Sequence, residues 1–164
     1  MEIVNKVASS SLLTIDLEEW YPENISTIDI KDYLFQGLIL KEKDFREALK
    51  LVDWKQFENK NVAVFCSADA IVPTWAFMLI SINLAPFAKK ITFGSEQKLI
   101  EEIYSDKIDA LKLDDYTEKR IVIKGCSKKS VPTLAYVKLA ATLQHIAKSI
   151  MYGEPCSTVP LFKK

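Results

Sequence analysis

Hydrophobic and polar residues alternate most regularly in the last two thirds of the chain. Short apolar runs at 62–65, 90–93, 121–124 and 147–152 carry the branched side chains that are typical of buried strands. The longer segments between them space their apolar residues as one face of a helix does. Strands separated by helices of this length predict βαβ units, and therefore a mostly parallel sheet with helices on both faces.

The predicted helices have recognisable starts. Pro73 and Pro132 each follow a valine and precede a threonine. Proline suits the first turn of a helix because it lacks an amide hydrogen that would find no acceptor there. These prolines predict helices over residues 72–84 and 131–144, and Ser95 is placed to cap a further helix that runs to about residue 105.

The first third of the chain is less regular. Its clearest strand is predicted where Leu13, Ile15 and Leu17 alternate with polar residues. Asp29 is placed to cap a short helix, and apolar spacing predicts an amphipathic helix over residues 41–52.

The 164 residues fit a single domain. Within residues 1–164, we expect an N-terminal α/β extension, residues 1–60, packed on a parallel core, residues 61–164. Right-handed crossovers and short connections predict a Rossmann-like sheet in the order 2-1-3-4. Here strand 1 is residues 62–65, which this order places beside residues 121–124.

A short pattern occurs three times in the chain. Cys66, Cys126 and Cys156 each precede a serine, and a Val-Pro pair follows each of them a few residues later. These are the only cysteines in the chain. In the predicted sheet all three emerge at the carboxyl edge, where open α/β folds bind ligands.

Three thiols in one place suggest a metal centre. An odd number of cysteines argues against a disulfide framework, whereas thiolates bind zinc or an iron-sulfur cluster. Asp69, three residues after Cys66, is the first candidate for a fourth ligand, and Glu154 is the second. An open fourth position would instead admit water or a small-molecule ligand, as in catalytic zinc sites.

Two other functions fit the same residues. The cysteines are inert and buried in a structural or interaction protein, which forms a homodimer through its N-terminal segment. Alternatively, one cysteine is the reactive group of a metal-free enzyme. There is no Cys-x-x-Cys pair, and the single histidine, His145, is expected at the end of a helix away from the thiols.

Charge balance and hydrophobic patterning argue against nucleic acid and membranes as partners. Lysine plus arginine equals aspartate plus glutamate at 22 each, so broad electrostatic binding to nucleic acid or to an anionic membrane is not expected. The apolar run at 71–88 is interrupted by polar residues and two prolines, so it does not suit a membrane span. No signal-peptide pattern opens the chain, and the cytoplasm is the predicted location.

Three longer strings resemble a known family. They are Asp29 to Leu38, Cys66 to Trp75, and Gly153 to Leu161. These strings are similar to an uncharacterised bacterial family, mostly from Bacteroidetes, that is catalogued as a domain of unknown function. The resemblance implies a small bacterial cytoplasmic protein and supplies no activity.

Overall fold

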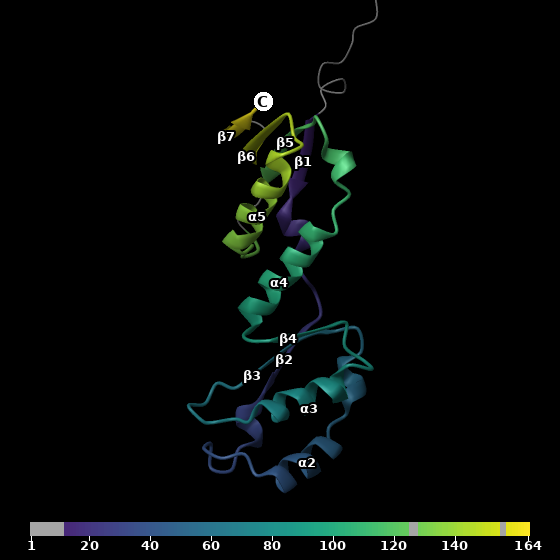
Figure 1. Cartoon of the computed structure of the whole chain (residues 1–164), viewed down its shortest axis with the longest axis vertical. Coiled ribbons are helices and arrows are strands. Elements are labelled where there is room, and N and C mark those ends of the chain that lie inside the picture. Colours follow the sequence, from purple (N-terminus) through teal and green to yellow (C-terminus); the bar gives the residue numbers. More distant parts are fainter. Residues whose placement is uncertain (1–11, 125–127, 155–156) are drawn as a thin grey trace, which may run out of the picture. The chain divides into compact units, whose positions relative to one another are not determined.

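The structure is a computed structural model that describes residues 12–124, 128–154 and 157–164. Its strands and helices are shown in Figure 1. The strands are β1 (Leu12–Asp16), β2 (Ile25–Asp29), β3 (Asn61–Phe65), β4 (Lys90–Phe93), β5 (Arg120–Lys124), β6 (Ser149–Glu154) and β7 (Ser157–Lys163). The α-helices are α2 (Glu42–Lys50), α3 (Thr74–Leu84), α4 (Glu96–Asp109) and α5 (Thr133–Gln144). The 3-10 helices are η1 (Leu17–Trp20), η2 (Ile30–Tyr33), η3 (Trp54–Phe57) and η4 (Leu113–Tyr116).

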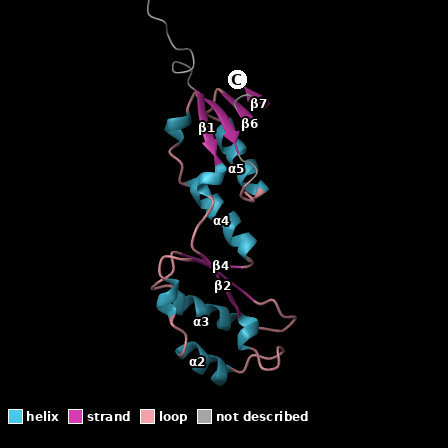
Figure 2. Ribbon diagram, turned by 180° about the vertical axis from the view of Figure 1, so that it is seen from behind, coloured by secondary structure: helices cyan, strands magenta, loops and turns pink. Residues whose placement is uncertain are grey.

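The strands form two sheets. Sheet A has the order β1-β5-β6-β7, and sheet B has the order β2-β3-β4. Every pair is parallel except β6 with β7. Figure 2 shows α5 beside the strands of sheet A, and α5 contacts β6. The predicted α/β class with mostly parallel strands is confirmed.

The predicted strand order is right in two places and wrong in one. Residues 62–65 pair with 90–93, and residues 121–124 pair with the strand that follows α5, as expected. The predicted pairing of 62–65 with 121–124 is absent, because β3 lies in sheet B and β5 in sheet A. Their remaining neighbours are β2 and β1, two strands from the first 60 residues.

Contacts divide the chain into two compact units. Unit 1 is Met1–Tyr21 with Ile103–Lys164, and unit 2 is Pro22–Glu102. The divisions therefore fall after Tyr21 and within α4, and not near residue 60. Each unit takes the first strand of its sheet from the N-terminal third of the chain.

The two units share one strand register. Val62 in β3 matches Ile121 in β5, which lies 59 positions later, and this spacing holds along β4 and β6. In unit 2, Asn61 pairs with Ile25 and Lys90; in unit 1, the matching Arg120 pairs with Leu12 and Ser149. Agreement at both neighbours indicates that the units are two copies of one fold.

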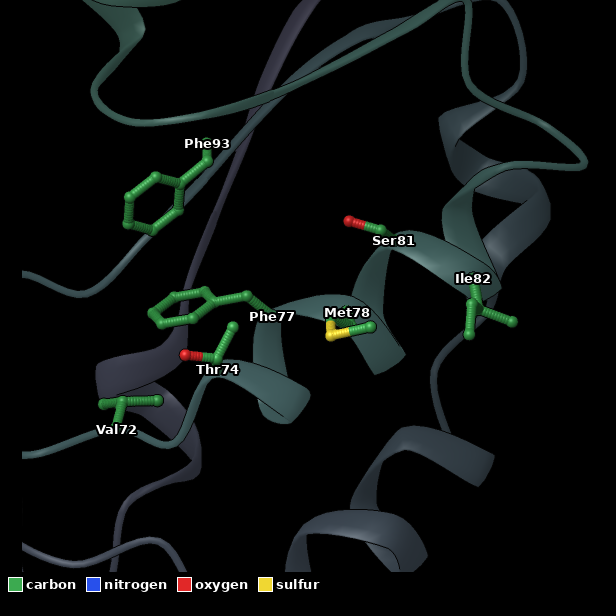
Figure 3. Close-up of a pocket in the computed structure, with 7 residues that line it drawn as sticks. All are labelled: Val72, Thr74, Phe77, Met78, Ser81, Ile82 and Phe93. Carbon is green, nitrogen blue, oxygen red and sulfur yellow. The ribbon is translucent and has the colours of Figure 1, made fainter.

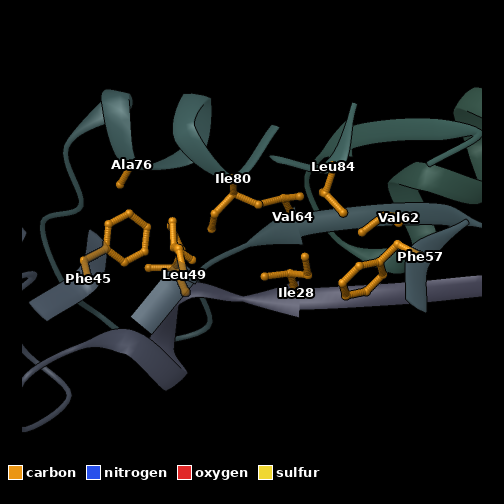
Figure 4. Close-up of a cluster of buried hydrophobic side chains, with 10 residues drawn as sticks. Ile28, Phe45, Leu49, Phe57, Val62, Val64, Ala76, Ile80 and Leu84 are labelled. Atoms are coloured by element: carbon orange, nitrogen blue, oxygen red, sulfur yellow. The ribbon is translucent and has the colours of Figure 1, made fainter. Parts of the chain in front are cut away.

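The buried cores match in the same way. Ile80 of α3 and its counterpart Leu139 of α5 are both completely buried. Figure 4 shows the unit 2 core, in which side chains from α2 and α3 lie over β2 and β3. The other matched buried pairs are Ile28 with Ile15, Ile30 with Leu17, Phe45 with Tyr104, Leu49 with Ile108, Val62 with Ile121, Ala63 with Val122, Val64 with Ile123, Ala76 with Ala135, and Leu84 with Leu143.

Unit 2 is inserted into unit 1. The first strand of each unit ends in Thr-Ile-Asp, at Asp16 and Asp29, and leads directly into a 3-10 helix. In unit 2, residues 34–41 then connect η2 to α2. In unit 1 the whole of unit 2 occupies the matching place, between η1 and the second half of α4.

The helices predicted from proline are present, but α3 and α5 begin at Thr74 and Thr133, two residues later than predicted. Pro73 and Pro132 are the N-cap residues of α3 and α5, one position before the first helical residue. The proline ring holds φ near −65°, which suits the entry to a helix. Each proline therefore fixes the end of the loop that leaves the central strand of its unit.

Candidate functional site

An acidic side chain holds the loop at the carboxyl edge of sheet B. Asp29, at the end of β2, accepts hydrogen bonds from the Ser67 hydroxyl at 2.5 Å, the Ser67 N–H at 3.0 Å and the Lys31 N–H at 3.0 Å. Partial burial acts to raise the pKa of Asp29, but these hydrogen bonds outweigh it and lower the pKa. The contact fixes the start of the loop between β3 and α3.

Cys66 behaves as a small apolar residue in this loop. Its side chain is half-buried and packs against the hydrophobic core of unit 2. The Cys66 Sγ lies 3.6 Å from the Ala68 carbonyl oxygen, which is the geometry of a weak thiol donor. Packing against the core and this local contact position the Cys66 side chain.

A different acidic side chain holds the corresponding loop of sheet A. In η1, Glu18 accepts hydrogen bonds at one carboxylate oxygen from the Lys128 N–H at 2.8 Å and the Lys129 N–H at 3.0 Å. These two backbone hydrogen bonds lower the pKa of Glu18. The Lys129 ammonium also lies 5.4 Å from the centre of the Tyr21 ring. Glu18 thus fixes the loop just after Cys126.

The base of this second loop is also charged. Lys124 ends β5, and its ammonium lies 4.0 Å from a carboxylate oxygen of Asp16. Asp16 also accepts a hydrogen bond from the Glu18 N–H at 3.0 Å, which caps η1. In the core of unit 1 the Tyr104 hydroxyl donates a hydrogen bond to the Leu17 carbonyl at 2.6 Å. Burial raises the pKa of Tyr104.

The strand pairing from which a common three-cysteine site was predicted is not the one that the structure shows. The expectation required the strands before Cys66 and Cys126 to be neighbours, and they belong to different sheets. In the sequence Cys126 follows β5 and Cys156 follows β6, and both lie outside the described residues. Within the described ranges, no three His, Cys, Asp or Glu residues gather as metal ligands would. The three-thiol centre therefore stays a prediction.

The 59-residue spacing between the units also determines which residues of the two cysteine-containing segments correspond. Strands β3 and β5 end at Phe65 and Lys124, which match at the 59-residue spacing. Counting onward, Cys66 matches Gly125, and Ser67 matches Cys126. Aligning the two Cys-Ser pairs with each other is therefore wrong by one position.

Asp69, the first candidate for a fourth ligand, is an exposed residue of the unit 2 loop. Its counterpart in unit 1 is Lys128, so the charge at this position is reversed between the units. The charge in η1 and η2 is reversed as well, because Glu18 matches Lys31. The two loops therefore differ in the charged side chains around them.

Sequence reasoning predicted Asp29 as a helix cap, which its hydrogen bond from the Lys31 N–H confirms, but it missed Glu18 and the contacts of both residues with the loops. A signal for Asp29 was the repeated Thr-Ile-Asp, at residues 14–16 and 27–29, whereas Glu18 lies two residues after the first copy. That repeat marks the ends of the first strands, at Asp16 and Asp29. His145, by contrast, is exposed at the C-cap of α5, as expected.

A family model described as "Protein of unknown function (DUF2480)" matches residues 1–164. The chain belongs to this family. The resemblance expected from the three strings is confirmed at the level of the family. No curated protein and no solved structure matches the chain. In the described part of this DUF2480 protein, none of the helices combines the length and apolar character needed to cross a membrane.

Proposed function

We propose that this DUF2480 protein binds zinc or an iron-sulfur cluster through Cys126 and Cys156, at the carboxyl edge of sheet A. The observation that carries the proposal is the pairing of β5 with β6, which sets Ile123 opposite Tyr152. Cys126 comes three residues after Ile123, and Cys156 four after Tyr152. Two loops that leave neighbouring parallel strands start about 4.8 Å apart, and thiolates on one metal ion lie within reach of that spacing.

The match between the two units adds a candidate metal ligand to the Cys126 and Cys156 thiols. In unit 2, Asp29 accepts hydrogen bonds from Ser67. The matching residues in unit 1 are Asp16 and Cys126. By this match we propose that the Asp16 carboxylate faces the Cys126 thiol and serves as a third ligand or holds the metal-bound water.

The surrounding charges support an anionic thiolate. Lys124 and Lys128 flank the cysteine on either side along the chain, and a positive charge nearby favours the thiolate that a metal needs. Glu18 holds the backbone at Lys128 and Lys129 and so keeps the second of these lysines at the loop. Unit 2 lacks this arrangement, since Asp69 stands where unit 1 has Lys128.

Metal analysis with single-cysteine variants tests the proposal. Protein purified without chelator is expected to hold about one zinc ion or one cluster per chain. Cys126→Ser and Cys156→Ser are expected to lose it, and Cys66→Ser is the matched control that retains it. Asp16→Asn keeps the helix cap and is expected to weaken metal binding at least about tenfold.

The other functions predict different results. Inert thiols predict no bound metal in the wild-type protein and slow, uniform alkylation of all three cysteines. A metal-free thiol enzyme predicts no metal and one cysteine that is alkylated much faster than the others at neutral pH. Loss of metal in Cys66→Ser would contradict the two-thiol site in unit 1.

A further inference from the structure

Strand β4 of unit 2 has an open edge. The Gly94 N–H donates to the Val64 carbonyl at 2.9 Å, so alternate residues of β4 face β3. Because backbone groups alternate between the two sides of a strand, the N–H and C=O groups of Ile91 and Phe93 point away from β3. In the described part of the chain, sheet B ends at β4.

The same edge is paired in unit 1. There Ile150 and Tyr152 of β6 match Ile91 and Phe93, and they lie opposite Phe162 and Val159 of the antiparallel strand β7. Unit 2 ends its sheet one strand earlier, with α4 following β4. The matching edge of unit 1 thus shows that an antiparallel strand can pair with the last parallel strand of this fold.

Apolar side chains lie beside the open edge. Figure 3 shows Phe93 of β4 near Phe77 of α3, with Met78 and Ile82 further along the helix. The two phenyl rings meet edge to face, with 5.0 Å between their centres. Met78, Ile82 and Phe93 are each about 60% exposed or more, and with Val72, Thr74 and Ser81 these residues line a hollow of about 700 Å³. Exposed apolar surface of this kind is typical of interaction sites.

We propose that a second copy of this chain covers this surface, with β4 of one copy pairing antiparallel to β4 of the other. Pairing of identical antiparallel strands creates a two-fold axis perpendicular to the sheet. Such an axis keeps both α3 helices on the same face, so that their apolar flanks meet across it. The interface then closes on itself and leaves no open β4 edge.

The residues of β4 favour one register. In this register Thr92 lies opposite Thr92 of the second copy, and Ile91 lies opposite Phe93. The backbone N–H and C=O groups of Ile91 and Phe93 point away from β3, so each such pair exchanges two hydrogen bonds. Lys90 lies opposite Gly94, which separates the lysines of the two copies. The aromatic and β-branched side chains of Phe93 and Ile91 form a favourable cross-strand pair on the α3 face, twice in the dimer.

The edge at β7 is less suited to pairing. It contains Pro160, which lacks an amide donor, and the β6–β7 register is irregular at Ile150/Met151. Proline and bulges are features that keep edge strands from pairing further. Strand β4, Lys90-Ile91-Thr92-Phe93, contains neither feature.

Mass measurement in solution and hydrogen exchange test the dimer on the full chain. We expect a concentration-dependent dimer by light scattering, in which the Ile91 and Phe93 N–H groups are protected and lose their protection on dilution. Met78→Lys and Ile82→Lys together are expected to raise the dissociation constant at least about tenfold. The matched control is Val137→Lys, since Val137 is the unit 1 counterpart of Met78 and is 64% exposed; it should leave the dimer intact.

Three outcomes would overturn the proposal. The first is a monomer at every accessible concentration. The second is a dimer in which the Ile91 and Phe93 N–H groups exchange as fast in the dimer as after dilution. The third is a dimer that the α3 variants leave unchanged while circular dichroism shows them folded. Hydrogen exchange on the wild-type protein decides the matter if those variants fail to fold.

Discussion

Units 1 and 2 have the same strand register and share many buried positions, but they differ at their edges. In the sequence of unit 1 one cysteine follows β5 and another follows β6, and the strand β7 pairs with β6, the last parallel strand. Unit 2 has one cysteine, which packs against its own core, and an open β4 edge. The shared positions are those that the fold requires. The differing positions are therefore where we place function, metal binding in unit 1 and self-association in unit 2.

The largest expected effect is on matched core residues. Ile80→Ala and Leu139→Ala each remove a completely buried side chain, and each is expected to lower the free energy of unfolding by about 3 kcal/mol. Val137→Ala, at a position that is 64% exposed, is the control and should change it by less than about 0.5 kcal/mol. Chemical denaturation measures all three. A large loss for only one of the two core variants would contradict the equivalence of the units.

A smaller effect is expected where the cores differ by one hydroxyl. The buried Tyr104 hydroxyl donates to the Leu17 carbonyl in unit 1, whereas its counterpart in unit 2 is Phe45. Tyr104→Phe leaves that carbonyl without its donor and is expected to cost about 1 to 2 kcal/mol of unfolding free energy. Denaturation of Tyr104→Phe beside wild type measures it, and unchanged stability would show that the hydrogen bond contributes nothing.

A smaller effect still is expected at the hydrogen bond between Ser67 and Asp29 in unit 2. Ser67→Ala removes the hydroxyl that donates to Asp29, so the lowered pKa of Asp29 should rise toward its ordinary value of 3.8. Carboxyl chemical shifts, followed by NMR as the pH is lowered, report this pKa. Ser67→Thr keeps a hydroxyl and is the control. An Asp29 pKa that is the same in Ser67→Ala and in wild type would contradict the assigned cause.

The smallest expected effect is a pH response in unit 1. The pKa of Glu18 is lowered, so its hydrogen bonds to Lys128 and Lys129 are fully present above the ordinary value of 4.5 and are lost as the pH falls through the folded-state pKa below it. The amide proton shifts of these two lysines should therefore titrate below pH 4.5. In Glu18→Gln the same shifts should stay flat over that range, and a titration that persists there would assign it to another group.

Much of the fold was predictable from local pattern. The parallel strands after residue 60 and the helices that begin after Pro73 and Pro132 follow from alternation, helical spacing and proline chemistry. Strands β2 and β7 were missed. Ser26 and Thr27 make β2 polar, and Pro160 interrupts β7, as expected for an edge strand.

Sheet membership was not predictable from the same pattern. The central strands β3 and β5 are both short apolar runs, and periodicity cannot tell whether two such runs pair with each other or with earlier strands. The pairing depends on β1 and β2, whose repeated Thr-Ile-Asp was the one available signal. The three-cysteine prediction depended on this pairing; Cys66 belongs to unit 2, whereas the proposed metal ligands belong to unit 1.

X-ray absorption at the metal edge of the purified protein tests the central claim most directly. We predict scattering from two sulfur atoms at about 2.3 Å from zinc, or the pattern of an iron-sulfur cluster. We also predict that Cys66→Ser leaves the spectrum unchanged and that Cys126→Ser abolishes it. A third protein sulfur that disappears in Cys66→Ser, or a wild-type protein without bound metal, would contradict the assignment of this function to unit 1.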